Sequence, residues 1–145
     1  MKLLIGEILI ILIFFGCDNK VKTARELIST CEGNIQTINF GLLLDSTTSY
    51  DGKLVEVTGY YHEGFEESAI SNSIKRPDEK SMIWVNFAPN VIDSFNKNPV
   101  KDQDIYEYLD GKRILIRGMV NPKAKGHMGQ YAASMELVCY VAVFD

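Results

Sequence analysis

The sequence repeats one short pattern, an Asp-Gly-Lys turn followed by alternating apolar and polar residues and a closing glycine. It occurs at 51–59 as DGKLVEVTG and again at 110–118 as DGKRILIRG. Asp-Gly tolerates the positive φ that a tight turn requires, and the side chains of a strand alternate between its two faces. Each copy therefore predicts a turn that leads into a half-buried strand.

The closing glycines of the two copies, Gly59 and Gly118, lie inside apolar strand patterns. Glycine in such a position often marks a bulge or a sharp bend, and a small closed sheet needs sharp bends in order to curl. Further strands are predicted at 69–73, 82–87 and 131–144. In the last of these, one phase of the strand consists of Met135, Leu137, Cys139, Val141 and Val143.

A polar insertion at 88–108 separates these strands, and we expect it to contain a loop and a short helix. About five strands with few helices favour an all-β domain with minor α content over residues 38–145. We predict a five-stranded, OB-like Greek-key barrel. A flattened barrel or a two-layer β-sandwich is the alternative architecture.

The chain from Asp51 to Val138 resembles a group of small bacterial OB-fold proteins of uncharacterised function. The shared features are the two DGK-strand-Gly segments, an apolar strand that contains Trp84, and the Gly-His-Met-Gly turn at 126–129. The resemblance implies the OB fold and brings no catalytic residues with it.

An unbroken run of Ile, Leu and Phe at 8–15 is followed by a glycine and then by Cys17. The run is shorter than the roughly 20 residues of a spanning helix and suits the apolar region of a signal peptide. The Gly-Cys junction resembles the lipobox of bacterial lipoproteins, which are cleaved before a cysteine that then receives lipid. This resemblance implies a signal peptide at 1–16 and lipid attachment at Cys17. An uncleaved anchor and an ordinary secreted protein are the alternatives.

Residues 17–37 are polar and mixed, with a weak helical spacing of apolar residues. We interpret them as a lipidated tether of partly helical character between the membrane and the domain. Two or more acyl chains give stable anchoring, whereas one does not. The expected location is the bacterial cell envelope, facing the periplasm or the surface, with the membrane itself as a partner.

The chain has a formal net charge of −4, so we do not expect nucleic acid as a partner. One region differs, because 111–135 contains five cations and no acid: Lys112, Arg113, Arg117, Lys123 and Lys125. This basic run suggests an anionic glycan or an acidic protein as the partner. The alternative is a hairpin whose charges are only solvated.

Four residues are candidates for ligand binding: Trp84, Arg117, Lys125 and His127. Tyr60, Trp84 and Arg117 occupy the outward phase of their strands, on faces that OB folds use for oligonucleotides or sugars. His127 lies between glycines that let a backbone approach a ligand closely. The alternatives are core packing for Trp84 and simple turn geometry around His127.

Cysteine usage and motifs give little support for catalysis. Cys31 and Cys139 could pair in a compartment that permits disulfides, or Cys139 could be a small buried apolar residue. The spacing fits no zinc pattern, and no nucleophile or phosphate-loop motif occurs. We therefore expect no metal, no cofactor and no catalytic residues. The predicted function is a non-catalytic binding module of an envelope lipoprotein; an inhibitor, immunity or assembly factor is the alternative.

Overall fold

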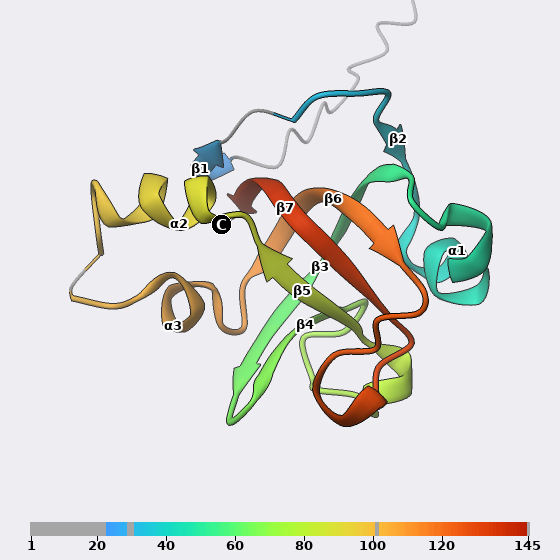
Figure 1. Ribbon diagram of the computed structural model, residues 1–145. Helices are drawn as coiled ribbons and strands as arrows, with labels where there is room; N and C mark the ends of the chain where they lie inside the picture. The colour runs from blue at the N-terminus through green and yellow to red at the C-terminus, as the bar shows by residue number, and fades with distance from the viewer. Residues whose placement is uncertain (1–22, 29–30, 101, 145) are drawn as a thin grey trace, which may run out of the picture.

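The computed structural model describes residues 23–28, 31–100 and 102–144 (Figure 1). The strands of this part of the chain are β1 (Thr23–Ile28), β2 (Gln36–Thr37), β3 (Leu54–Gly64), β4 (Glu67–Ser71), β5 (Ile83–Phe87), β6 (Arg113–Asn121) and β7 (Ala133–Phe144). The α-helices are α1 (Phe40–Asp45), α2 (Pro89–Asn96) and α3 (Ile105–Leu109). Short 3-10 turns are η1 (Thr47–Tyr50), η2 (Glu79–Ser81) and η3 (His127–Gly129). The protein is mostly β, as predicted.

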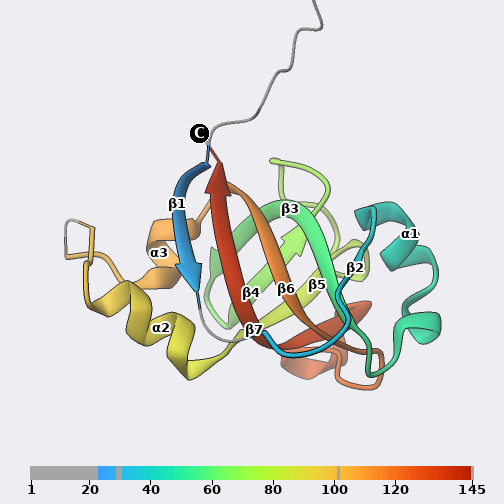
Figure 2. The same ribbon diagram turned by 90° about the horizontal axis from the view of Figure 1, so that it is seen from above.

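Five of the strands close into a barrel in the order β3–β4–β5–β7–β6 and back to β3. Every neighbouring pair in this circuit is antiparallel except β5 and β7, which run parallel. The helices α2 and α3 stand between β5 and β6 in sequence and lie at one end of the barrel (Figures 1 and 2). This arrangement confirms the predicted OB-like barrel.

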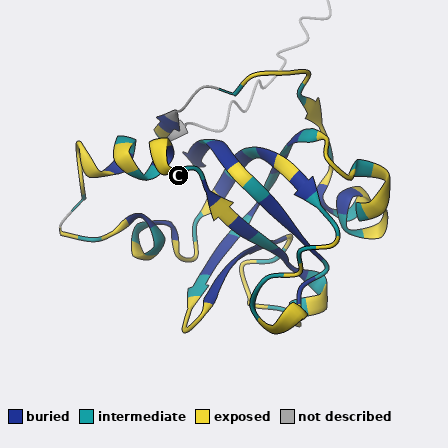
Figure 3. Cartoon of the chain, viewed as in Figure 1, coloured by how far each residue is buried: buried dark blue, intermediate teal, exposed yellow. Residues whose placement is uncertain are grey.

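The barrel interior is filled by the apolar phase of each strand, and burial alternates along β3 and β6 (Figure 3). Val55 and Val57 of β3 and Ile114 and Ile116 of β6 are at most 1% exposed. Burying an aliphatic side chain of this size stabilises the fold by about 1.5–3 kcal/mol. The alternation in the repeated pattern therefore identified the core faces correctly.

Strands β3 and β6 form one antiparallel ribbon, and each DGK turn makes backbone hydrogen bonds to the opposite strand at one end of it. Gly52 donates its N–H to the carbonyl of Val120, and Val120 donates to the carbonyl of Lys53, at 2.9 and 3.1 Å. Gly111 and Lys112 make the same pair of bonds with Tyr61 of β3, at 2.9 and 3.0 Å. Both glycines have φ of +70°. Each turn is thus a G1 bulge, which requires glycine in the left-handed region.

The closing glycines lie where another strand comes too close for a side chain. A Cβ on Gly59 would lie 2.7 Å from the carbonyl oxygen of Ser71, at the end of β4. A Cβ on Gly118 would lie 2.9 Å from a methyl group of Val138 in β7. Because β3 and β6 must each contact strands on both sides as the barrel closes, both positions exclude even alanine.

The segment predicted as a partly helical tether differs in the structure. Residues 23–28 form the strand β1, which pairs antiparallel with β7 (Figure 2). Leu27 is buried, and a disulfide joins Cys31 to Cys139 with their Cα atoms 5.5 Å apart. The helical expectation was wrong because β7 offers a free edge, and pairing with it outweighs a weak helical pattern. The folded unit therefore extends beyond the predicted boundary at residue 38, and Cys17 lies outside the described residues.

The predicted phase of the last strand is interrupted at Leu137. This residue has φ of +50° and is 58% exposed. The pairing of β7 shifts register at this point against both β5 and β6. From Met119 to Arg117, two steps along β6 oppose four steps along β7, from Glu136 to Tyr140. The extra residues form a local bulge, after which Val141 and Val143 keep the predicted inward phase. Met135 and Val138 are therefore buried while Leu137 faces solvent.

Candidate functional site: a groove on the outer face of β3 and β6

The outer face of the barrel has a row of side chains, joined by hydrogen bonds and one cation–π contact, that crosses five strands. Arg117 of β6 donates to Glu56 of β3 at 2.7 Å, and Thr37 of β2 donates to the same carboxylate at 3.0 Å. The Arg117 guanidinium also lies 4.2 Å from the ring centre of Tyr140 in β7. Tyr140 in turn donates to Glu26 of β1 at 3.0 Å, and burial together with this acceptor raises the pKa of Tyr140. The Arg117 guanidinium is therefore already engaged by Glu56 and by the Tyr140 ring.

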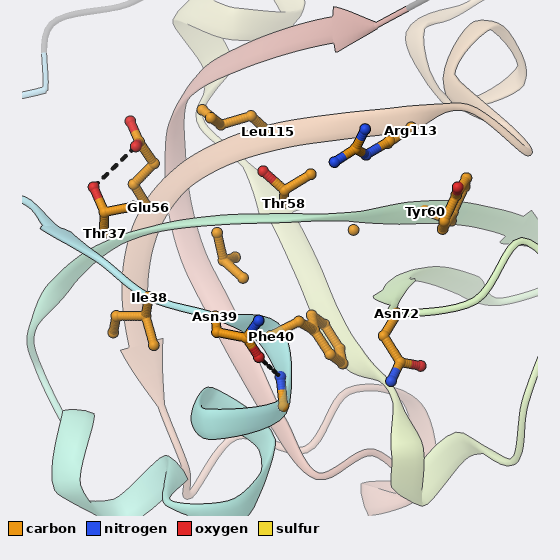
Figure 4. A pocket seen from close by; sticks show the side chains of 13 residues that line it. Thr37, Ile38, Asn39, Phe40, Glu56, Thr58, Tyr60, Asn72, Arg113 and Leu115 are labelled. Carbon is orange, nitrogen blue, oxygen red and sulfur yellow. Dashed lines mark hydrogen bonds between the residues drawn. The ribbon is translucent and has the colours of Figure 1, made fainter. Parts of the chain in front are cut away.

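A groove of about 610 Å³ begins beside this row (Figure 4). Its floor is the outer face of β3 and β6, and its wall is the segment that joins β2 to α1. The polar side chains that line it are Thr37, Asn39, Glu56, Thr58, Tyr60, Asn72 and Arg113. Its apolar lining comes mainly from Ile38, Phe40 and Leu115. A mixed lining of hydroxyls, amides and two aromatic rings suits a polar organic ligand.

Arg113 is the group in the groove whose charge is open to a ligand. Within the described residues it makes no salt bridge, whereas Glu56 is already paired with Arg117. Figure 4 shows the Arg113 side chain beside Thr58, and its guanidinium lies 5.6 Å from the ring centre of Phe144 in β7. Asn39 uses its amide oxygen to cap α1 through the N–H of Gly41 at 2.9 Å, so its amide N–H groups remain available as donors. The groove thus combines hydroxyl and amide groups with one unneutralised positive charge.

Trp84 belongs to a small packed cluster on the outside of β4 and β5. It packs with Ala69, Met82 and Tyr131, and its ring meets the Tyr131 ring edge-on at 5.1 Å. The indole N–H donates to Asn86 at 2.9 Å. The segment 122–132 approaches this ring so closely that a Cβ on Gly126 would lie 2.6 Å from it. The face of β4 and β5 that was expected to bind ligand is therefore covered here by the protein's own chain.

His127 lies in the turn that the same segment makes at η3. Gly126 and Gly129 have φ of +61° and +70°, so turn geometry does require both glycines. The His127 ring lies 2.9 Å from the carboxylate of Glu66 in the β3–β4 turn. Its ring nitrogen thus already contacts an internal partner.

The four predicted binding residues do not form one site. Trp84 and His127 lie on the covered side of the barrel, Lys125 is exposed on the segment above them, and Arg117 lies on the opposite ribbon. A strand rises about 3.3 Å per residue, so the ends of β6 are roughly 26 Å apart. The basic run is therefore spread along a strand and a loop instead of forming a patch.

The residues of the groove that sequence reasoning missed are Arg113, Asn39 and Asn72. Arg113 was within the basic run, but nothing in the sequence distinguished it from Arg117. The distinction depends on Glu56, which is opposite Arg117 in the β3–β6 pairing. Alternation alone could have selected Thr58, since it shares the outward phase with Tyr60.

The described residues contain no group of three or more His, Cys, Asp or Glu side chains that could hold a metal ion. No helix among them is long and apolar enough to cross a membrane.

Comparison with known proteins gives no family. No family model matches the chain, and no curated protein matches it. Among solved structures, a protein of Leishmania major Friedlin assigned as an aspartyl-tRNA synthetase is similar at 10% sequence identity, with a TM-score of 0.38. The similar region covers 83% of this chain and 23% of that one. A similarity at this level supports no statement about function.

Proposed function

We propose that this protein is a lipid-anchored protein of the bacterial cell envelope whose OB-like barrel binds an anionic glycan without catalysis. The observation that supports this function is the groove over β3 and β6, in which Arg113 has no carboxylate partner among the described residues. The Gly-Cys junction at residues 16 and 17 supports the anchor and the location.

The groove matches the chemistry of an acidic sugar chain. A guanidinium and a carboxylate form charge-assisted, often bidentate hydrogen bonds. Thr58, Asn72 and Asn39 can exchange hydrogen bonds with sugar hydroxyls, and the Tyr60 ring offers an apolar surface for a sugar face. A pocket of several hundred Å³ is of the usual size for small ligands.

Binding is tested with the full chain in detergent micelles, titrated with a tetrasaccharide of galacturonic acid and with its neutral methyl-ester form. We expect the acidic form to bind about tenfold more tightly, since hydrogen bonds to charged groups contribute about 1.5–3 kcal/mol. Arg113→Gln should abolish this preference. Lys123→Gln, which removes an exposed cation outside the groove, is the matched control and should keep it. Equal binding of both sugars by the wild type, or an unchanged preference in Arg113→Gln, would contradict the proposal.

The anchor is tested separately by labelling cells with a fatty-acid probe. The wild type should be labelled, while Cys17→Ser should lose the label and accumulate as uncut precursor. Equal labelling of the two proteins would exclude lipid attachment at Cys17.

A further inference from the structure

The barrel end formed by the β3–β4 turn and η3 exposes two large apolar side chains. Phe65 is 94% exposed and Met128 is 79% exposed, and both turns lie at the surface in Figure 3. Their sequence neighbours Glu66 and His127 are in contact at 2.9 Å. This contact brings the two turns together, so Phe65 and Met128 are exposed on adjacent turns. We call Phe65, Met128 and the hollow described next the turn surface.

A hollow of about 290 Å³ lies beside the β3–β4 turn, where it is lined by Gly64 and Glu66, the two chain neighbours of Phe65. Trp84, Phe87 and Tyr106 give it an aromatic lining, and Glu63, Glu66 and Glu67 contribute carboxylates. Two of these acids already have partners, because Glu67 accepts from Arg76 at 3.0 Å and Glu66 contacts His127. Glu63 is different. It accepts a hydrogen bond from the Tyr61 hydroxyl at 3.1 Å and makes no salt bridge within the described residues.

The surroundings of Glu63 add negative charge instead of compensating it. The carboxylate of Asp110 accepts the backbone N–H of Glu63 at 3.0 Å. Burial, together with the charges of Asp104, Asp110 and Glu67, raises the pKa of Glu63 above its usual value. Burial and Glu63 itself likewise raise the pKa of Tyr106. A cation placed in the hollow would relieve this repulsion, and Arg76 and His127 are already paired with other acids.

We propose that the turn surface docks a protein partner that presents an arginine between apolar side chains. The arginine would enter the hollow, pair with Glu63 and stack on the aromatic lining, because a guanidinium combines both interactions in one planar group. The flanking apolar side chains would cover Phe65 and Met128. The described chain begins with β1 at the opposite end of the barrel (Figure 1), so this surface faces away from that end. It is separate from the groove over β3 and β6 and does not depend on the glycan.

The test uses the full chain in detergent micelles and two peptides, acetyl-Leu-Arg-Leu-amide and acetyl-Leu-citrulline-Leu-amide. Citrulline keeps the shape of arginine and removes its charge. The readout is the emission of Trp84, which lines the hollow and is the only tryptophan of the chain. We expect the arginine peptide to bind about tenfold more tightly.

Three variants distinguish the parts of the proposal. Glu63→Gln should lower the affinity for arginine to that for citrulline, and it is conservative because glutamine keeps an acceptor for Tyr61. Phe65→Ser combined with Met128→Asn should weaken both peptides by the same factor. Asp45→Asn, an exposed carboxylate on α1, is the matched control and should change neither affinity.

The proposal is overturned if both peptides bind the wild type equally, or if Glu63→Gln keeps the preference for arginine. It is also overturned if neither peptide changes the emission of Trp84 up to about 10 mM, a concentration that would fill even a site with a Kd of about 1 mM.

Discussion

Substituting Gly126 tests whether the segment 122–132 is held against the barrel by close packing on Trp84. Gly126 and Gly129 both have positive φ, at +61° and +70°, so alanine is strained by backbone conformation at either position. For a residue in the left-handed region that strain costs about 1–2 kcal/mol. Gly126 also has ψ of −157°, a combination almost confined to glycine, and alanine there costs about 1–3 kcal/mol. The two positions differ in space, because a Cβ on Gly129 meets nothing within 4 Å. A Cβ on Gly126 would lie 2.6 Å from the Trp84 ring and 2.7 Å from the Tyr131 ring.

Real Cβ contacts are not this short, so in Gly126→Ala either the indole or the segment must move. Forcing extra atoms into a packed site costs about 1–3 kcal/mol. Added to the backbone strain, the expected loss in the free energy of unfolding is about 2–6 kcal/mol, against about 1–2 kcal/mol for Gly129→Ala. Such a loss is a large part of the 5–15 kcal/mol that usually stabilises a domain.

Urea unfolding of the two variants measures the free energies, and Trp84 emission reports the movement directly. In Gly126→Ala the emission should shift to longer wavelength before any unfolding, since the ring loses its cover. Gly129→Ala should keep the emission of the wild type. Equal stability losses in the two variants, with Trp84 emission unchanged in both, would refute the idea that this segment is fixed by packing on Trp84.

Three further predictions concern other parts of the fold. The pKa of Glu63 is raised in the folded state, so the folded protein holds the carboxyl proton more tightly than the unfolded chain does, and this contribution to stability is lost as the pH rises above the usual value of 4.5. Glutamine resembles the protonated acid, so Glu63→Gln should raise the urea midpoint at pH 7 and leave it unchanged near pH 3. A midpoint that falls at pH 7 would contradict this. Cys31→Ser combined with Cys139→Ala removes a disulfide that closes a loop with a sequence separation of 108. The double variant should lower the free energy of unfolding in urea by about 3–5 kcal/mol. A loss below about 1 kcal/mol would mean that β1 already holds this segment in place. Gly111 has φ of +70° and open space around it, so Gly111→Ala should lower the free energy of unfolding by about 1–2 kcal/mol in the same assay. Gly111→Asn should lower it less, because asparagine tolerates this conformation better. No loss with alanine would contradict a G1 bulge.

The parts of the fold that local patterns determine were predictable from sequence. The repeated turns and the inward phase of Val57 and Ile116 depend on a few adjacent residues. Gly59 and Gly118 stood out in the sequence, but what requires glycine there is the close approach of Ser71 and Val138 from other strands. The disulfide between Cys31 and Cys139 and the strand β1 depend on the free edge of β7, which exists only once the barrel has closed. The exposed Leu137 results from a bulge, and strict alternation does not reveal a bulge.

The candidate site was less predictable, for a related reason. Whether a charged side chain is available to a ligand depends on its partner across the sheet. Arg113 and Arg117 share one face of β6, but only Arg117 is opposite Glu56. In the same way, Trp84 is in the outward phase of β5, where its exposure depends on a segment some forty residues later that folds over it. Pairing register decides the first case and the path of the segment 122–132 decides the second, and neither can be derived from composition or spacing.

The bond between Cys31 and Cys139 also has a mechanical consequence. A pull applied between residue 23 and the end of β7 passes along the chain to Cys31, crosses the disulfide to Cys139, and continues to Phe144. The residues between 31 and 139 lie outside that path, so the load reaches only β1 and the last part of β7. Tension can peel β1 from β7 one hydrogen bond at a time, and the disulfide then keeps the residues between Cys31 and Cys139 out of the covalent load path. The loaded end of β7 stays paired with β6. A protein tethered through its N-terminus could thus be tugged repeatedly without stretching the groove over β3 and β6.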